Sequence, residues 1–463
     1  STRNMACKAQ TSGTIYLRHG PRTELHEIIR QEYARHQDRA VPRNTLRQAV
    51  QGMLDTFAYQ NFDAAAGEYT NRCCRPPRET EMRPWRLVTE IGWTGGGVLA
   101  YPLVLCRDAL GADAEAPLAA AMSGEQLFDR IADAYNENSG LLNDLMAPNA
   151  AGSQVNGWWT GYGLVKDCHC AYTVGSAIHY LTKTMDYLHQ NGKPCPAKWM
   201  DAAQKVLHTV MDLQRADGAF GYTYSTQERK VLDWSGFAGC WFAPALVYLY
   251  RLTGEERCLH SAEKALDYYH TFVKDLNCYG TPMDTWKAVD EEGNLAFMRG
   301  SRLLYEQTGK AEFLQYMKDS AGYEFLWRYG YKTYPEHTPL NQGWSACGGA
   351  VTSVSNPHIH PMGVIIDTDL RYLARVTGDG YYASRAADSA AWMLQCLELY
   401  PAATGYGRYG ILSERWCPSD GLDVERFSDG RPFSSWFSHN LWASACVLEA
   451  ACELLLEIEH KKG

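Results

Sequence analysis

The segment Ala245–Tyr269 reads ALVYLYRLTGEERCLHSAEKALDYY, and it decides the fold class. It contains an apolar stretch, a Thr-Gly pair at Thr253 and Gly254, and a second stretch that carries charges on one face. Glycine is expected just after the C-terminus of a helix, because it adopts the left-handed conformation without the steric cost of a Cβ atom. The segment therefore predicts two consecutive helices joined by a tight turn.

The same phrase recurs twice further along the chain. Gly300–Tyr323 reads GSRLLYEQTGKAEFLQYMKDSAGY, and Asp369–Trp392 reads DLRYLARVTGDGYYASRAADSAAW. The three turn glycines, Gly254, Gly309 and Gly378, are separated by about 55 and about 69 residues, a long period that is typical of arrays of helical hairpins.

The two helices of each hairpin differ in kind. The helix after Gly254 has an apolar stripe and a charged opposite face, which is the pattern of a helix with water on one side. The preceding segment Cys240–Tyr250, CWFAPALVYLY, is apolar nearly all round, which indicates a helix buried on every side. The pattern predicts alternating outer and inner helices.

Applied to the whole chain, this distinction predicts an all-α fold, an (α/α)6 toroid. The inner helices are expected to start near Gly96, Ala171, Phe237, Leu295, Gly363 and Trp436, and the outer helices to span about 45–60, 124–135, 197–213, 255–276, 311–328 and 381–399. Closure into a ring leaves no apolar end hairpin that would need a polar cap. We expect a toroidal catalytic domain at 41–463 and an N-terminal extension at 1–40, with one extra helix over about 22–37. Short alternating pieces such as Phe220–Thr226 predict hairpins within the loops.

Composition narrows the function classes. The chain has 463 residues, 46% apolar and 21% charged, with a net charge of −9. No basic stripe favours nucleic acid, and no apolar run has the roughly 20 residues that cross a bilayer. The 15 scattered cysteines favour free thiols in the cytoplasm, although a leader removed by processing stays open. Cys73-Cys74 and Cys168-His169-Cys170 lack the spacing of zinc ligands, so we expect neither a metal nor a cofactor.

The loops place the site at one end of the ring. Connections with Thr-Gly are very short, whereas those that lead into the inner helices are long and rich in Trp, Tyr, Asp and His. Binding residues often lie on such loops above a rigid scaffold. Aromatic faces suit sugar rings, although tryptophans also plug barrel ends. The predicted substrate-binding residues are Trp93, Trp158, Trp159, Trp234, Trp286, Trp344, Arg408, Arg415, Trp416 and His439.

The repeat L-x-x-L-Y-x-x-T-G and the long loops resemble the six-hairpin glycosidase superfamily, over nearly the whole chain from about Thr45. The resemblance implies a sugar-binding enzyme, and the unsaturated glucuronyl hydrolases, which act on uronic acids, are the nearest likeness. That family places an aspartate at the mouth of each of two neighbouring inner helices. Asp233 in LDWSG and Asp284 in MDTW stand at comparable places.

Glycoside hydrolysis needs a protonated carboxyl group and an ionised one on either side of the scissile bond. We expect Asp284 to be the general acid and Asp233 the general base, with Trp286 and Trp234 excluding water. Either aspartate alone is equally well explained as a helix N-cap. Glu90, Asp167 and Glu414 are reserve carboxylates, whereas Asp367 and Asp369 are expected to be structural.

Two histidines stand in the stiff phrase Asn356-PHIHP. His358 and His360 lack a third metal ligand at an obvious spacing, so we expect them to contact a substrate carboxylate or to transfer a proton. Arg408 and Arg415 are the candidate carboxylate clamps, since arginine binds carboxylates bidentately. A packed loop in which each ring bonds backbone is the plainer explanation for the histidines.

Two other functions fit the same residues. A polysaccharide lyase or a sugar 2-epimerase would use a histidine or tyrosine base, drawn from His358, His360, Tyr406 or Tyr409. A non-catalytic carbohydrate-binding toroid is the second alternative. The sequence thus predicts a glycosidase that acts on an oligosaccharide with an acidic sugar, and leaves these alternatives open.

Overall fold

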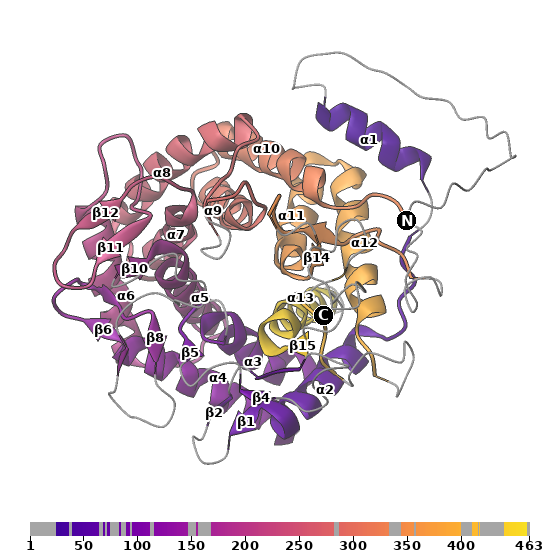
Figure 1. Cartoon of the computed structure of the whole chain (residues 1–463), viewed down its shortest axis with the longest axis horizontal. Helices are drawn as coiled ribbons and strands as arrows, with labels where there is room; N and C mark the ends of the chain where they lie inside the picture. The colour runs from indigo at the N-terminus through magenta and orange to yellow at the C-terminus, as the bar shows by residue number, and fades with distance from the viewer. Residues whose placement is uncertain are drawn as a thin grey trace, which may run out of the picture.

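The computed structural model forms a double ring of helices (Figure 1). It describes residues 25–36, 39–63, 68–69, 72–74, 83–84, 89–92, 95–111, 115–146, 154–155, 168–281, 287–332, 344–355, 358–399, 410–414, 416 and 439–460. Among these residues the inner helices are α3 (Gly97–Leu110), α5 (Ala171–Gln190), α7 (Phe242–Thr253), α9 (Glu292–Thr308), α11 (Asp367–Thr377) and α13 (Leu441–His460). The outer helices are α2 (Leu46–Thr56), α4 (Glu115–Asp133), α6 (Ala197–Asp212), α8 (Glu256–Lys274), α10 (Ala311–Trp327) and α12 (Gly380–Cys396).

The predicted alternation of inner and outer helices is confirmed. Gly254, Gly309 and Gly378 each follow a helix in the left-handed conformation, with φ of 73°, 65° and 70°. Some boundaries differ from expectation. Helix α4 begins at Glu115, nine residues before the predicted start at Gly124, and α13 begins at Leu441 rather than near Trp436.

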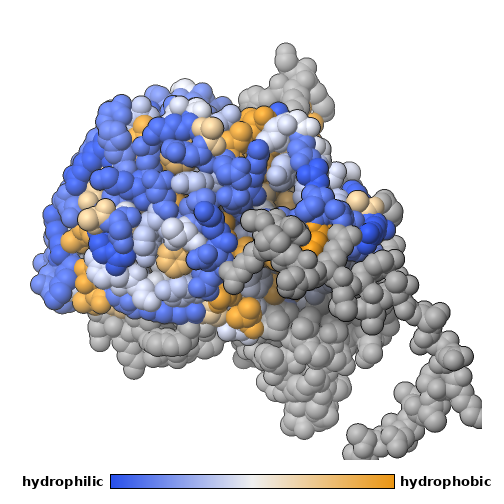
Figure 2. Space-filling view, turned by 90° about the horizontal axis from the view of Figure 1, so that it is seen from above, coloured by the Kyte–Doolittle hydropathy of each residue, from blue (hydrophilic) through white to orange (hydrophobic). Residues whose placement is uncertain are grey.

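Each outer helix exposes only one of its faces to water. In α8, Cys258, Ala262 and Leu266 are buried, while charged residues cover the other side. Figure 2 shows one side of this outer wall, where hydrophilic residues predominate among isolated hydrophobic ones. Helix α1 (Leu25–Arg35) lies outside the ring beside α10 and α12 (Figure 1), where Arg30 binds Asp379 at 2.6 Å and the Tyr33 hydroxyl donates to Asp388.

Short helical turns and small antiparallel sheets lie in the connections between the helices of the ring. The turns are the π-helical η2 (Phe57–Asn61) and the 3-10 helices η4 (Ala238–Trp241) and η5 (Met362–Ile366). The sheets are β1 (Phe62–Asp63) with β2 (Glu68–Tyr69); β15 (His439–Asn440), β3 (Arg72–Cys74) and β4 (Arg83–Pro84); β5 (Thr89–Glu90), β8 (Leu145–Met146) and β9 (Gln154–Val155); β6 (Tyr135–Asn136) with β7 (Leu141–Leu142); β10 (Cys168–Cys170), β11 (Thr223–Ser225) and β12 (Val231–Asp233); and β13 (Ala350–Val351) with β14 (Ile359–His360). Strand β11 confirms the hairpin predicted around Phe220–Thr226.

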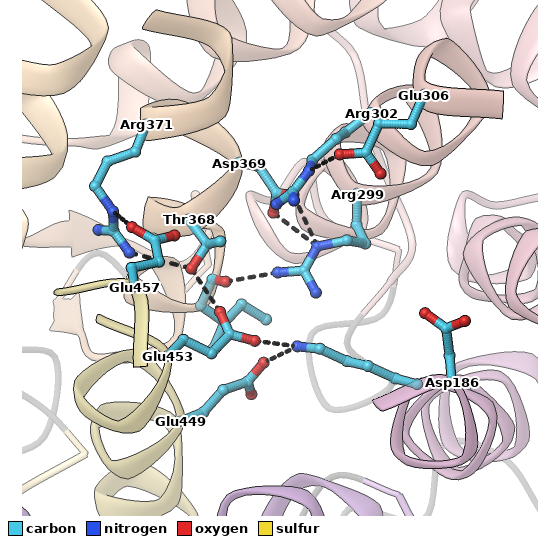
Figure 3. Close-up of polar contacts among 12 residues, drawn as sticks. Asp186, Arg299, Arg302, Glu306, Thr368, Asp369, Arg371, Glu449, Glu453 and Glu457 are labelled. Carbon is cyan, nitrogen blue, oxygen red and sulfur yellow. Dashed lines mark hydrogen bonds and ion pairs between the residues drawn. The ribbon is translucent and has the colours of Figure 1, made fainter. Parts of the chain in front are cut away.

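Charged side chains of the inner helices meet in the centre of the ring (Figure 3). This central ion network consists of Lys183, Asp186, Arg251, Arg299, Arg302, Glu306, Thr368, Asp369, Arg371, Glu449, Glu453 and Glu457. Arg299 Nε lies 2.8 Å from a carboxylate oxygen of Asp369, which is wholly buried. Lys183 Nζ lies between two glutamates, 2.5 Å from Glu449 and 2.8 Å from Glu453. The network links α5, α7, α9, α11 and α13 across the ring.

Burial and charge act in opposite directions inside this network. Burial raises the pKa of Glu449, although the charge of Lys183 opposes the rise. Burial would also raise the pKa of Glu453, but the charges of Lys183 and Arg299 outweigh it and hold that pKa below its usual range. The two glutamates beside one lysine therefore differ in acidity.

Two further features concern the described residues. The eleven cysteines whose side chains are described are free thiols, and Cys106 of α3 lies 3.8 Å from Cys452 of α13, where the ring closes. None of the helices in the described part of the chain is long and apolar enough to cross a membrane.

The turn glycines provide a first test. Gly254→Ala is expected to lower the free energy of unfolding by about 1 kcal/mol, because a Cβ atom is strained in the left-handed conformation even though open space surrounds it. Gly380→Ala is the control, because Gly380 also faces open space but has no positive φ; it should leave stability unchanged or raise it by up to about 1 kcal/mol. Equal losses in chemical denaturation would contradict the role of the turn.

The central ion network provides a second test. Asp369→Asn should lower the free energy of unfolding by roughly 3–5 kcal/mol, because it removes the carboxylate that pairs directly with the buried Arg299. Asp212→Asn removes the partner of Arg257 in a pair whose side chains are 50% and 58% exposed, and should cost less than about 1 kcal/mol. Urea titration of both variants measures the difference, and a small loss in Asp369→Asn would show that the network is dispensable.

Candidate active site

Aromatic and acidic side chains mark the N-terminal ends of the inner helices. Tyr172 stands at the start of α5, Trp241 ends η4 before α7, Glu292 begins α9, Met362 begins η5 before α11, and Trp442 stands at the start of α13. The long connections also enter the ring at these ends, whereas the short Thr-Gly turns lie at the other end. We call this end the mouth.

Tyr172 connects three of these helix starts. Its hydroxyl donates to Glu292 Oε2 at 2.5 Å and approaches Met362 Sδ at 3.6 Å, and its ring packs edge-on against Trp241 at 5.9 Å. Glu292 is only 2% exposed. A buried carboxylate that accepts such a bond is stabilised in its ionised form, and the N-terminus of α9 favours the same form.

The β13–β14 hairpin brings the two predicted histidines to the mouth. The rings of His358 and His360 lie 6.2 Å apart, and His360 packs on Trp442 at 4.5 Å. The backbone N–H of Met362 donates to His360 Nδ1 at 3.1 Å. Neutral His360 must therefore carry its proton on Nε2.

Two predicted tryptophans join the same cluster. Trp416 forms a two-way backbone bridge with Ile359, between the histidines, and Trp344 stacks on Trp416 with ring centroids 6.1 Å apart. The indole N–H of Trp442 donates to Glu414 Oε2 at 3.1 Å. The structure thus brings together four predicted residues, His358, His360, Trp344 and Trp416, with the reserve carboxylate Glu414.

Asp233 and Trp234 lie apart from this cluster. Asp233 ends β12, which lies at the outer edge of the ring, far from β14 (Figure 1). Its side chain is 38% exposed and binds Lys287 Nζ at 2.6 Å. Trp234 lies under the guanidinium of Arg215, 5.1 Å from the ring centroid. The acid–base pairing of Asp233 with Asp284 stays a prediction, because Asp284 is outside the described residues.

Most remaining predicted residues are also outside the described part of the chain. They are Trp93, Trp158, Trp159, Asp167, Trp286, Arg408 and Arg415. Glu90 lies in β5, opposite Leu145, and His439 lies in β15, opposite Cys74, but their side chains are not described.

Sequence reasoning missed Tyr172, Glu292 and Trp442. Glu292 stands in the phrase DEEGN, directly before a predicted inner helix. Acidic residues at the start of that helix were the sequence signal that could have identified it. Tyr172 and Trp442 fall within apolar helix starts, where an aromatic residue is the ordinary core choice. Only the closed ring shows that these side chains meet.

Two buried aspartates hold the backbone behind the mouth. Asp290 accepts hydrogen bonds from the N–H groups of Thr281 and Gly293; burial raises its pKa to about 7, although these bonds oppose the rise. It fixes Thr281, the last described residue before the segment that contains Asp284. Asp367 lies beside Arg328 at 2.8 Å, and burial raises its pKa to about 6.

Ser139, His169 and Asp144 are arranged like a hydrolytic triad. His169 lies 2.8 Å from Ser139 Oγ and 3.0 Å from Asp144 Oδ1, and Asp144 also accepts the N–H of Cys170. All three are at most 1% exposed, and Asp144 ties them to the backbone of β10 through the N–H of Cys170. We interpret them as an anchor for β10, two residues before Tyr172. No group of three potential metal ligands occurs among the described residues.

A scan against protein-family models finds no match, and a search of curated proteins by sequence finds none. Solved structures do match. A family 76 α-mannanase of Bacteroides thetaiotaomicron has a TM-score of 0.58 at 14% identity, over 91% of this chain and 98% of that one. A cellobiose 2-epimerase of Spirochaeta thermophila has 0.56 at 12%, over 95% and 99%. An unsaturated glucuronyl hydrolase specific for heparin has 0.52 at 11%, over 90% and 98%.

These neighbours are members of the six-hairpin glycosidase superfamily. Their match spans nearly the full length of both chains at an identity that establishes shared architecture alone. The fold expected from the sequence is therefore confirmed: the chain is an (α/α)6 toroid.

Proposed function

We propose that this protein is a carbohydrate-active enzyme that binds a sugar at the mouth and hydrolyses a glycosidic bond there. One observation carries the proposal: Trp344, Trp416 and Trp442 gather with two histidines and Glu414 from distant parts of the chain. Aromatic faces suit the C–H surfaces of a sugar, and polar groups nearby bind its hydroxyls. The structural neighbours with the same fold act on carbohydrates, which supports this choice.

Glu292 is the proposed ionised carboxylate of the reaction. It is buried at the mouth, and the Tyr172 hydroxyl holds one of its oxygens. Asp284 remains our proposed general acid, because it belongs to the same connection into α9. The partly buried ion pair of Asp233 with Lys287 favours a supporting role for Asp233, in which it fixes the end of that connection.

An acidic sugar is the finer part of the proposal. It rests on His358 and His360, which lie at the mouth, and on the sequence-based expectation that Arg408 and Arg415 bind a carboxylate. A panel of nitrophenyl glycosides and uronic-acid oligosaccharides, with products separated by chromatography, tests both the reaction and the sugar.

A sugar epimerase is the second candidate, and His360 is the observation in its favour. The bond from Met362 to Nδ1 places the proton of neutral His360 on Nε2, where it can be donated to a sugar oxygen, and Trp442 supports the ring. An epimerase would incorporate solvent deuterium into the sugar without releasing a shorter product. A lyase would instead yield an unsaturated product that absorbs in the near ultraviolet.

The carboxylate role gives the central test of function. Glu292→Gln should lower kcat by at least about 100-fold, because the amide cannot serve as base or nucleophile. Glu312→Gln changes the corresponding residue in the first turn of an outer helix and should leave kcat unchanged. Wild-type turnover in Glu292→Gln would rule out this role, and sugar binding without turnover in the wild type would favour the non-catalytic alternative.

Two tryptophan substitutions distinguish a sugar site at the mouth from one at the β11–β12 hairpin. Trp416→Ala should raise KM about tenfold through the loss of an aromatic contact. Trp234→Ala removes a predicted binding residue that stacks with Arg215 instead, and should leave KM unchanged. Steady-state kinetics on the best substrate of the panel measure KM for both variants. A raised KM in Trp234→Ala with an unchanged KM in Trp416→Ala would place the site at the β11–β12 hairpin instead.

A further inference from the structure

A cluster of buried acids lies directly behind the mouth. Glu291 precedes α9, Glu324 and Arg328 belong to the end of α10, and Asp367 begins α11. Glu291 and Glu324 are wholly buried, and the side chains of Arg328 and Asp367 are at most 2% exposed. The cluster thus places three carboxyl groups around one guanidinium.

Arg328 is committed to two of the three acids. Its Nη1 donates to Asp367 Oδ1 at 2.8 Å, and its Nε and Nη2 donate to Glu324 Oε1 at 3.0 and 2.8 Å. Its Nη2 also donates to the carbonyl oxygen of Gly363 at 2.8 Å. The guanidinium therefore balances at most one of the two charges that it contacts, and it donates no bond to Glu291.

Glu291 has no donor among the described residues. Both of its carboxyl oxygens and Glu324 Oε2 are buried without an N–H or O–H directed at them. An ionised carboxylate buried in this way is far more costly than a neutral one. The facing carboxyl group of Glu324 supplies a partner only if one of the two groups is protonated, since two carboxylates repel each other.

We propose that Glu291 and Glu324 share one proton at neutral pH and that this pair positions Glu292 and His360 in the mouth. The positioning of Glu292 and His360 by this pair rests on the proposed function. The shared proton forms an O–H···O bond from one carboxylic acid to the other carboxylate, and Arg328 donates its own hydrogen bonds to Glu324. Burial and the charge of Glu324 raise the pKa of Glu291 well above its usual value, in agreement with this state.

The pair reaches the mouth by two routes. Glu291 is the N-terminal cap residue of α9, so its placement sets that of Glu292, which follows it and accepts the bond from Tyr172. Its Oε1 also lies against η5: a Cβ atom on Gly363 would stand only 2.3 Å from it. The preceding residue of η5, Met362, donates to His360.

The groups that face Glu291 come from each neighbouring element. They are Glu324 and Arg328 of α10, Glu292 of α9 and Cys446 of α13, with Asp367 of α11 held by Arg328. Above the pKa of the pair, a second negative charge would develop in this closed space. We therefore expect the pair to open at high pH and to release both α9 and η5.

The test compares the wild type with Glu291→Gln, which keeps a hydrogen-bond donor at every pH. The raised pKa of Glu291 means that wild-type stability should fall as pH rises from the unfolded value of about 4.3 through the folded value. Denaturant midpoints from about pH 5 to about pH 9 should fall less steeply in Glu291→Gln. Asp144, Asp290 and Asp367 are present in both proteins, so their contributions cancel.

Infrared spectra supply the second readout. The carbonyl band of a protonated carboxylic acid should be present in the wild type at neutral pH and weaker in Glu291→Gln. Glu312→Gln, on the exposed face of α10, should keep the wild-type band and the wild-type pH slope. Equal slopes and equal bands in the wild type and Glu291→Gln would overturn the shared proton.

Activity tests the positioning role separately. Glu291→Leu, which removes the hydrogen bond, should lower kcat by roughly 10- to 100-fold with little change in KM, whereas Glu291→Gln should keep kcat and extend activity to higher pH. Loss of kcat in both variants would refute positioning by a neutral pair. A wild type with the predicted slope and band but no activity on any sugar would instead refute the proposed function.

Discussion

The ring depends on the attraction between buried opposite charges at its centre. Short Thr-Gly turns join α7, α9 and α11 to the outer helices that follow them, whereas side chains of α5, α9, α11 and α13 meet in the centre of the ring. Arg299 with Asp369, and Lys183 with Glu449 and Glu453, join them. Each of these groups would be costly to bury alone, so removing one partner should destabilise the ring. These ion pairs therefore help to hold the inner helices that carry the residues of the mouth.

The fold was predictable because its signals are local. Gly254, Gly309 and Gly378 each end an inner helix, and a one-sided apolar stripe identifies each outer helix whatever lies far away in the chain. The central charges were harder to interpret. Arg299 and Glu449 stand in mostly apolar helices, and nothing in their spacing shows that both point to the same axis. Charge complementarity between helices distant in sequence becomes visible only after closure.

The site was predictable to the extent that rare residue types identify it. His358, His360, Trp344 and Trp416 belong to unusual loop phrases, and the structure brings them together. Asp233 was chosen for its place before an inner helix, a criterion that also fits a residue on the outer hairpin. Glu292 satisfied the same criterion in a phrase of three acids, where sequence alone does not distinguish the carboxyl that faces the mouth.

The three acids Asp290, Glu291 and Glu292 show how neighbouring residues acquire different chemistry. Asp290 accepts two backbone N–H bonds, from Thr281 and Gly293. Glu292 accepts the hydroxyl of Tyr172, whereas Glu291 receives no donor among the described residues and meets another carboxyl. Hydrogen bonds to Asp290 and Glu292 favour their charged forms, whereas burial without a donor favours the neutral form of Glu291. A carboxyl held neutral beside one held as an acceptor is the arrangement that acid–base catalysis uses. Here the neutral member lies behind the helix start, so its effect on the mouth must act through the placement of Glu292.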